Sequence, residues 1–376
     1  MILPSGAPTT LHPGPHPSQR WSPDHLRLHR HLLRHPGLLP AGAPLLLAVS
    51  GGQDSMALLA LLLDLRRLHH WTLLLWHGDH GWRADSAHQA EELATWCLQQ
   101  GLSLVVDRCG EGGPPSEGGP PSEGGSPSEG GSPSEAMARH WRYGQLEARA
   151  RALGASHVVT GHTASDRAET LLLHLARGSH RRGLASLRSQ RPLAKGPDES
   201  RDSSSIELSR PLLTFSRSDT ARICRQLELP VWHDPANHDL RYSRNRIRAE
   251  VLPVLEALHP GAAQRIGAQA ERLVSELECR TEMVDLALQN LNSARGPGAA
   301  AALERLGLVA LAPANQGELL HRWLECQIQQ VLAARPLEQL LSRLQAGQPP
   351  GRADLGAGWQ LRWDQRTLWL QPDPPQ

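Results

Sequence analysis

The residues best suited to chemistry form one short loop, Ser50-Gly51-Gly52-Gln53-Asp54-Ser55. An apolar run over residues 45–49 precedes this loop and a helical pattern over 55–68 follows it, which predicts a strand, a glycine turn and a helix start. Backbone amides in such a turn can bind an anion. Ser50 and Ser55 add hydroxyl donors, and Asp54 adds a carboxylate where a triphosphate and a metal ion would lie. The loop is therefore predicted to bind phosphate, although it lacks the Gly-Lys-Ser/Thr ending of a Walker A sequence.

A second polar segment covers residues 160–170, Thr-Gly-His-Thr-Ala-Ser-Asp-Arg-Ala-Glu-Thr. It joins a predicted strand to a predicted helix, at the strand end where ligands of doubly wound sheets gather. Asp166 and Glu169 are three residues apart and share one helical face. Paired carboxylates in that position can bind ammonium groups, help to hold a metal ion or orient an attacking amine. His162 is a candidate contact to a nucleotide.

Further polar groups have less specific patterns. His77 and His80 flank Asp79 after the next predicted strand, and a polar loop near the nucleotide is a better interpretation than a metal site, because Mg²⁺ can be held largely by phosphates. Arg139 and Arg142 by themselves are as typical of a solvated helix face as of a site.

Four arginines within eight residues form a basic run that can neutralise RNA phosphates or a leaving pyrophosphate. As a charge run alone it is more typical of a solvated helix end. The four are Arg241, Arg244, Arg246 and Arg248.

Together these segments resemble known families. A strand, Ser-Gly-Gly-x-Asp-Ser and a helix are the PP-loop pattern of N-type ATP pyrophosphatases, which release pyrophosphate and leave AMP on an oxygen of the substrate. Within that group the chain resembles the tRNA(Ile)-lysidine synthases over about residues 44–256. The matching segments are 77–83, Glu-Ala-Met-Ala-Arg-His-Trp-Arg-Tyr at 135–143, 160–170, 177–184, 210–213, 233–237 and Tyr-Ser-Arg-Asn-Arg-Ile-Arg at 242–248.

The resemblance implies a two-step reaction with ATP and Mg²⁺. The wobble cytidine O2 of a tRNA(Ile) with a CAU anticodon attacks the α-phosphate, and the amine of free L-lysine then displaces AMP to form lysidine. The catalytic residues implied are Asp54, Asp166 and Glu169, with Asp54 also at the metal. The nucleotide-binding residues implied are Ser50, Gly51, Gly52, Gln53, Asp54, Ser55, His77 and His162. The tRNA-binding residues implied are Arg139, Arg142, Arg244, Asn245, Arg246 and Arg248.

The chain departs from the family pattern at three positions. The family usually has two consecutive acids followed by Gln where this chain has Ser165-Asp166-Arg167, so one negative charge is lost and one positive charge is gained. Ala236 stands where the family often has a hydroxyl residue, which removes one hydrogen bond.

Two other kinds of function compete with this prediction. A related tRNA thiolase would use paired cysteines, and an amidotransferase would need a glutaminase domain for which there is no room. The five cysteines are scattered without Cys-x-x-Cys spacing, which predicts neither a zinc site nor a disulfide framework. A catalytically inactive RNA-binding protein would not need the intact set Asp54, Asp166 and Glu169.

The predicted elements that position these residues alternate. Strands at 45–49, 71–76, 102–106 and 156–160 alternate with helices at 55–68, 86–100, 135–153 and 165–177. This order predicts an α/β fold with a doubly wound, mostly parallel sheet, of the adenine-nucleotide α-hydrolase-like PP-loop type. A polar loop is predicted at about 189–209. Helical periodicity continues from 243 to about 344, and two alternating runs around Asp364-Gln365 predict a hairpin.

Four regions follow from these patterns. They are a flexible N-terminus with a short helix (1–40), a catalytic PP-loop domain (41–235), a helical tRNA-binding domain (236–347) and a β-hairpin tail (348–376). Residues 111–134 are four copies of a Gly- and Pro-rich hexapeptide, which predicts a disordered insertion.

The charge and hydrophobicity of the chain limit how it can interact with RNA or with a membrane. Lys and Arg total 39 and Asp and Glu total 38, so an RNA partner must be met by a local basic patch. The start of the chain has no signal-peptide pattern, and no apolar run approaches the roughly 20 residues of a membrane span. We expect a cytoplasmic protein that does not enter a membrane. The oligomeric state is left open, a homodimer included.

Overall fold

The computed structural model describes nine segments of the chain: residues 21–81, 85–109, 133–179, 181–185, 187–193, 206–232, 239–292, 301–329 and 332–372. Three predicted segments lie wholly or partly outside the described residues: residues 1–20 of the flexible N-terminus (1–40), residues 111–132 of the repeat insertion (111–134), and the motif at 233–237. The chain divides into two compact units, Met1–Val274 and Ser275–Gln376.

The first unit is built on a six-stranded sheet with the order β3-β2-β1-β4-β6-β5. All neighbouring pairs are parallel except β5 with β6. This is the predicted doubly wound, mostly parallel sheet. Its strands are β1 (Pro44–Ala48), β2 (Thr72–Asp79), β3 (Leu104–Arg108), β4 (His157–Val159), β5 (Gln190–Pro192) and β6 (Glu207–Ser209).

The prediction of a polar loop at about 189–209 is therefore wrong at both ends of that range, where β5 and β6 form. Each of these strands has three residues, which is too short for an alternating pattern to be recognised. Their place in the sheet comes from long-range pairing: Leu208 of β6 pairs with Val158 of β4 and with Arg191 of β5.

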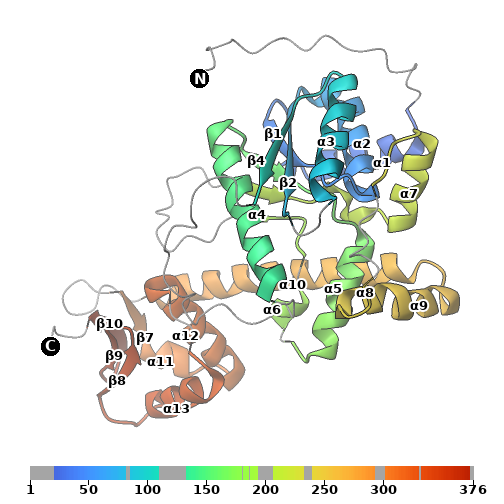
Figure 1. The fold of residues 1–376 in the computed structure, drawn as a ribbon. Coiled ribbons are helices and arrows are strands. Elements are labelled where there is room, and N and C mark those ends of the chain that lie inside the picture. The colour runs from blue at the N-terminus through green and yellow to red at the C-terminus, as the bar shows by residue number, and fades with distance from the viewer. Residues whose placement is uncertain are drawn as a thin grey trace. The chain divides into compact units, whose positions relative to one another are not determined.

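Helices accompany this sheet (Figure 1). They are α1 (Pro23–Arg34), α2 (Gln53–His69), α3 (Ser86–Gln99), α4 (Pro133–Ala152), α5 (Ala164–Ala176), α6 (Arg181–Leu184), the 3₁₀ turn η1 (Pro211–Thr214) and α7 (Arg217–Gln226).

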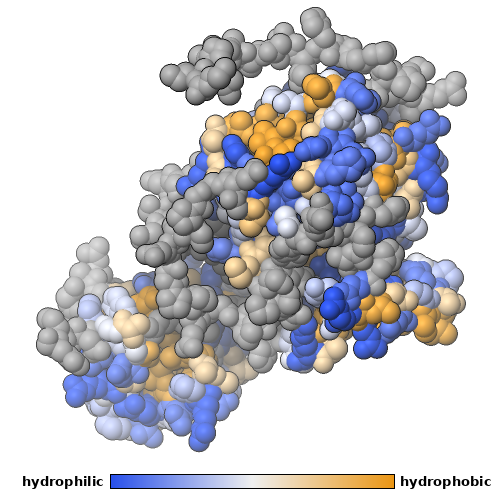
Figure 2. Space-filling model, in the orientation of Figure 1, coloured by the Kyte–Doolittle hydropathy of each residue, from blue (hydrophilic) through white to orange (hydrophobic). Residues whose placement is uncertain are grey.

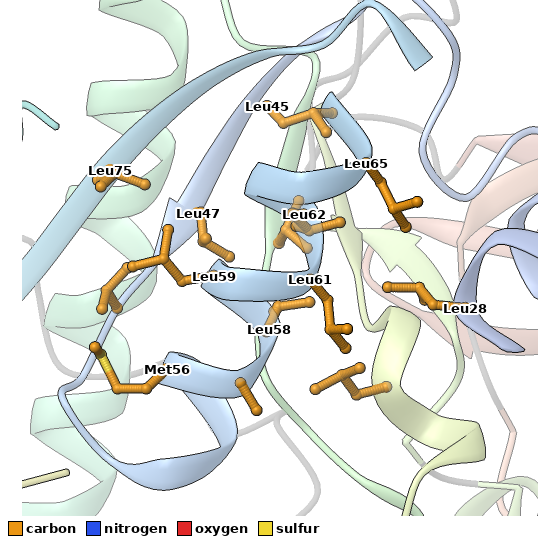
Figure 3. Packing of buried hydrophobic residues seen from close by; sticks show 14 of the residues in the cluster. Leu28, Leu45, Leu47, Met56, Leu58, Leu59, Leu61, Leu62, Leu65 and Leu75 are labelled. Carbon is orange, nitrogen blue, oxygen red and sulfur yellow. The ribbon is translucent and has the colours of Figure 1, made fainter. Parts of the chain in front are cut away.

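Helix α2 forms the centre of the main core. Leu58, Leu61 and Leu65 are fully buried because this helix is apolar over most of its circumference. Figure 3 shows its side chains between Leu28 of α1 and the strand residue Leu47. The helix that starts at the predicted phosphate loop is thus held rigidly, which fixes the position of the loop.

Three short helical segments follow: α8 (Ser243–Arg246), a π-helical turn η3 (Ile247–Val251) and α9 (Leu252–Leu258). Leu252 packs with Ala168 of α5 and Ala263 of α10 (Ala262–Leu291) in a small core. Val254 and Leu258 remain 57% and 65% exposed on the outer side of α9, where Figure 2 shows hydrophobic surface.

The second unit has its own antiparallel sheet with the order β7-β10-β9-β8. The predicted hairpin is present as β9 (Trp359–Trp363) and β10 (Thr367–Pro372). Two more strands extend it, and β7 interrupts the region predicted to be helical to residue 344. The remaining elements are β7 (Ala302–Glu304), α11 (Arg305–Val309), α12 (Pro313–Ile328), α13 (Ala334–Leu344) and β8 (Gly351–Gly356).

One buried arginine joins the elements of the second unit. The Arg305 guanidinium donates hydrogen bonds to the backbone carbonyls of Leu344, Gln345, Gln348 and Asp364. Its charge is thus solvated by peptide oxygens beside a core that contains Leu324 and Leu368. Across the described residues of both units, no helix has the length and apolar character needed to cross a membrane.

Candidate active site

The predicted phosphate loop is a preformed turn between β1 and α2. Gly51 has a φ of +82°, a conformation that favours glycine, and extended Gly52 caps the helix. The Ser50 N–H donates to Ser55 Oγ at 3.2 Å, and Ser55 Oγ donates to the Gly52 carbonyl at 2.8 Å. These bonds fix the loop before any ligand binds.

The loop after β4 packs directly against the start of α2. A Cβ added to Gly161 would lie 2.9 Å from backbone atoms of Asp54 and Ser55, so only glycine allows this approach. β1 and β4 are neighbours in the sheet at its topological switch point, where ligands bind in doubly wound folds. The structure thus brings together the two segments that the sequence predicts to carry chemistry.

Asp54 is held by the first turn of α7. Thr220 Oγ1 donates to Asp54 Oδ1 at 2.5 Å, and the Arg217 guanidinium lies 3.4 Å from Oδ2. Burial and the nearby charge of Asp166 raise the pKa of the Asp54 carboxyl, against the opposing effect of Arg217. Two carboxylates from different segments therefore approach each other with residual repulsion between them.

The predicted acids and two of the predicted tRNA-binding arginines form one buried cluster. Arg244 donates to Glu169 Oε2 at 2.8 Å and to Asp166 Oδ1 at 3.0 Å. Arg248 donates to both oxygens of Glu169, at 2.7 and 2.9 Å. The side chain of Glu169 is only 1% exposed, so the two arginines balance charges that would be costly to bury alone.

Asp166 is also tied to its own helix end. Its Oδ2 accepts hydrogen bonds from the backbone N–H and the hydroxyl of Thr163, the residue that caps α5. Although burial opposes ionisation, Arg244, His162 and these bonds lower the pKa of Asp166 to about 2. Burial and the Arg210 guanidinium lower the pKa of His162 to about 3, so its imidazole is neutral at pH 7.

The other predicted site residues make contacts of their own. His77 donates from Nδ1 to the Val49 carbonyl at 2.8 Å, just before the phosphate loop, and burial lowers its pKa. The Arg139 guanidinium lies 5.4 Å from the centre of the Tyr143 ring, and its charge acts on His162. Arg142 contacts His80 Nε2 at 2.7 Å.

Three predicted residues have side chains engaged elsewhere. Gln53 donates to the Arg217 carbonyl of α7 at 2.8 Å, so its amide does not face the loop's anion site. Buried Asn245 donates to the Asp239 carbonyl at 3.0 Å. Arg246 is 61% exposed and pairs with Glu250 at 2.9 Å.

Sequence reasoning missed the contribution of α7. Arg217 and Thr220 hold Asp54, yet the segment was not predicted to be helical. The signal was present, because Ser216 and Asp219 have capping-box spacing and form that box in the structure. Arg210, whose charge acts on His162, gave no signal beyond its place in a shared segment.

Two of the three residues that depart from the family pattern have structural partners, and the third, Ala236, lies outside the described residues. Ser165 Oγ accepts the backbone N–H of Arg217 at 3.1 Å and so positions the start of α7. Arg167 is buried and turns away from Asp166, donating to Glu271 of α10 and to the Leu187 carbonyl. The extra positive charge is therefore neutralised outside the carboxylate cluster.

The donor set fits a metal ion that is held mainly by phosphates. The charge of Asp166 raises the Asp54 pKa, and a cation near Asp54 would offset this repulsion between the two carboxylates. Within the described residues no group of three or more His, Cys, Asp or Glu side chains could hold a metal without such help. Asp54 is the residue here that would hold Mg²⁺, with the nucleotide supplying the other ligands.

Comparisons with known proteins agree with this geometry. Residues 29–255 match the family model of the PP-loop domain. A tRNA(Ile)-lysidine synthase of Parasynechococcus marenigrum is 51% identical, covering 94% of this chain and 96% of that protein. One of Prochlorococcus marinus is 39% identical over 93% of this chain and 96% of its own length. The solved U34-tRNA thiolase NcsA of Methanococcus maripaludis shares the fold, with a TM-score of 0.52 at 16% identity over 66% of this chain and 78% of that one.

Proposed function

The chain belongs to the PP-loop family and, within it, to the tRNA(Ile)-lysidine synthases, and we propose that it ligates lysine to C2 of the wobble cytidine in tRNA(Ile) with a CAU anticodon. The reaction consumes ATP and releases AMP and pyrophosphate. The observation that carries this proposal is the close approach of Gly161 to Asp54, because it sets the carboxylate pair beside the phosphate loop.

In the first step the cytidine O2 attacks the α-phosphorus of ATP, and the bond to the β-phosphate oxygen breaks to release pyrophosphate. We assign ATP phosphates to the amides of Gly51 and Gly52 and to the hydroxyls of Ser50 and Ser55 at the N-terminus of α2; a phosphate would replace Ser50 Oγ, to which the Gly52 N–H donates at 3.3 Å. Mg²⁺ at Asp54 supplies charge neutralisation on the phosphates when bound. Arg217 keeps the Asp54 carboxylate in place.

In the second step the lysine amine attacks C2 of the base. The C2–O2 bond breaks, O2 leaves with AMP, and the amine loses a proton. The attacking amine must be neutral, and lysine also carries an α-ammonium group that an acid can bind. We assign this positioning to Asp166 and Glu169, with Arg244 and Arg248 able to exchange a carboxylate contact for a phosphate.

The chemistry of the cysteines supports a ligase over a thiolase. Burial raises the pKa of the Cys97 and Cys224 thiols to about 11, which disfavours the reactive thiolate. Cys109, Cys279 and Cys326 are exposed, and none of them is joined in a disulfide within the described residues. A sulfur-transfer site needs an accessible thiolate pair, whereas nucleophilic attack by lysine does not involve a cysteine.

A direct assay tests the proposal. The protein is incubated with ATP, lysine and unmodified CAU-anticodon tRNA(Ile), and the digested tRNA is analysed by mass for lysidine. We expect one lysine per tRNA and one pyrophosphate released, with no product on a CAU-anticodon tRNA(Met). Pyrophosphate release that depends on tRNA(Ile) without lysidine would exclude lysine as the nucleophile, and a lack of tRNA-dependent turnover would exclude the adenylation step as well.

Three further assignments belong to this proposal. Residues 236–347 are proposed to contact tRNA, and the protein is proposed to act in the cytoplasm, where its tRNA substrate is made. A homodimer is the assembly to look for. Light scattering of the purified protein with and without tRNA decides whether one or two copies bind each RNA.

A further inference from the structure

A basic groove lies along α1, outside the cluster around Asp166. It has a volume of about 410 Å³, and it is lined by Arg27, Arg30, His31 and Arg34 of α1 together with Thr214 of η1. The remaining lining residues, Pro23 and Leu26, are apolar, so the groove itself carries no acidic side chain. A groove with three arginines and a histidine suits an anion.

The arginines differ in how firmly they are held. Arg27 donates to the Thr214 carbonyl, pairs with Asp219 at 3.2 Å and lies over the Phe215 ring at 4.3 Å. Arg30 and Arg34 are exposed, one helical turn apart, and have no ion pair in the described part of the chain. One guanidinium is therefore fixed at the wall, and two are available to a ligand.

His31 adds an unused hydrogen-bonding atom to the groove. Its Nε2 is buried and has no hydrogen-bond partner among the described residues. Burial and the charges of His35, Arg34, Arg167 and Arg27 lower the His31 pKa to about 4, so the ring is neutral at pH 7. A neutral imidazole can still donate one N–H to an anion, and Arg27 and Arg34, two of the groups that depress its pKa, would attract that anion.

The groove is close to the proposed active site. Thr214 is three residues before Arg217, so their Cα atoms lie within about 11 Å of each other, and Arg217 contacts Asp54. The neighbour of Thr214, Phe215, accepts the backbone N–H of Ala164 at the start of α5. An RNA strand whose base reaches Asp166 can therefore place a nearby phosphate against α1.

We infer that the α1 groove, Arg27, Arg30, His31 and Arg34, binds a backbone phosphate of the substrate RNA. This inference rests on the proposed function for the identity of the RNA. Phosphate contacts of this kind position the RNA without reading its sequence. Arg30 and Arg34 supply the exchangeable charge, and Arg27 and His31 form the wall behind it.

Binding measurements separate this inference from the catalytic proposal. Direct binding of CAU-anticodon tRNA(Ile) is measured without ATP or lysine, over a range of salt concentrations, for the wild type and for the double variant Arg30→Gln with Arg34→Gln. We expect affinity to fall on the order of tenfold and the slope of log K against log salt to decrease by about 1. The KM for tRNA should rise by a similar factor while the KM values for ATP and lysine stay unchanged.

A matched control removes two arginines that are also exposed and lie in the last turns of other helices, Arg67→Gln with Arg225→Gln. This control should retain wild-type affinity and salt slope. Equal loss in both variants would mean a general charge effect, and an unchanged double variant at α1 would overturn the inference even if lysidine is formed. Inorganic phosphate that competes with tRNA only in the control and wild type would support the groove. Failure of the wild type to make lysidine would defeat the proposed function, while RNA binding still decides the groove.

Discussion

At the scale of single residues, the role proposed for Asp54 works against folding. Burial and the Asp166 charge raise its pKa, so the folded state binds its proton more tightly than the unfolded chain does. The ionised carboxylate therefore lowers stability once the pH exceeds the ordinary value for Asp, and the full loss is reached above the raised pKa. Such a penalty is expected of a charge kept for chemistry.

Replacing Asp54 by Asn tests this trade-off. We expect tRNA-dependent pyrophosphate release to fall by at least about 10²-fold, because a group acting on transition-state charge is lost. Thermal unfolding at pH 7.5 should show an unchanged or higher Tm, since the buried charge is removed. Replacing Asp64, a mostly buried carboxylate paired with His25, by Asn is the control and should lower the Tm while leaving turnover nearly intact below it. A D54N protein with full turnover would refute the role of Asp54.

Asp166 has the opposite linkage. Its pKa is lowered from 3.8 to about 2, so its carboxylate stabilises the fold by about 2 kcal/mol above pH 4, and this contribution is lost as the pH falls through about 2. We expect Asp166→Asn to lower the free energy of unfolding by about that amount at pH 7. The difference from the wild type should shrink as unfolding is measured from pH 4 towards pH 2. A difference that does not depend on pH would mean that Asp166 stabilises only by packing.

At the scale of elements, the glycine turn and segment 229–232 support each other. The Trp232 N–H donates to the Gly51 carbonyl at 3.0 Å, and the Trp232 ring would lie 3.2 Å from a Cβ at Gly51. Trp232 Nε1 in turn donates to Glu92 of α3 at 2.8 Å. Helix α3, which follows β2 in the chain, thus supports the glycine turn through Trp232.

Gly51→Ala should therefore damage ATP binding beyond the cost of its backbone conformation. A left-handed φ costs a non-glycine residue roughly 1–2 kcal/mol, and the Trp232 contact adds to it at the loop. We expect the KM for ATP to rise about tenfold. Gly101→Ala is the matched control, because Gly101 has a φ of +70° and open space around it. It should lower stability by a similar amount without changing the KM, and equal KM values for both variants would exclude the bracing role.

In helix α5, the arginine that departs from the family pattern, Arg167, is neutralised by a residue of another helix, α10. Arg167 is buried and its anion is Glu271, which is itself 45% exposed. We expect Glu271→Gln to destabilise the protein by about 1–3 kcal/mol, because a buried guanidinium loses its counter-charge. Glu250→Gln, which breaks the exposed pair with Arg246, should change stability by less than about 0.5 kcal/mol. The KM for lysine should be unchanged in both variants, and an increase in Glu271→Gln would place Arg167 in the lysine site.

What could be predicted at this scale depended on local patterns. Strand β1 and helix α2 follow from apolar runs, whereas the three-residue β4 was predicted as the short apolar stretch before the polar segment at 160–170 that leads into α5. Strands β5 and β6 have three residues each and exist through pairing at long range. The sequence placed Arg244 and Arg248 in one basic run, but their pairing with Asp166 and Glu169 depends on how α8 and η3 pack on α5, which the run alone does not determine.

At the scale of the whole molecule, the net charge says little about where positive charge is exposed. The sums of 39 basic and 38 acidic residues nearly cancel, and many arginines are used inside the fold. Arg305 is solvated by carbonyls, Arg167 is paired with Glu271, and Arg244 and Arg248 face carboxylates. The overall composition therefore carries little information about RNA binding, and exposed unpaired arginines such as Arg30 and Arg34 do more to attract a polyanion.

The two compact units have separate apolar cores, which predicts separate thermal transitions. Leu324 of α12 is fully buried in the second core, so Leu324→Ala should cost about 2–5 kcal/mol there and lower one Tm on the order of 10 °C. Leu58 and Leu62 belong to the core of the first unit, so the transition of the first unit should keep its Tm. Calorimetry of the full chain measures both transitions, with Leu306→Ala, at 48% exposure, as the control. A single transition that moves as a whole would show that the units unfold cooperatively.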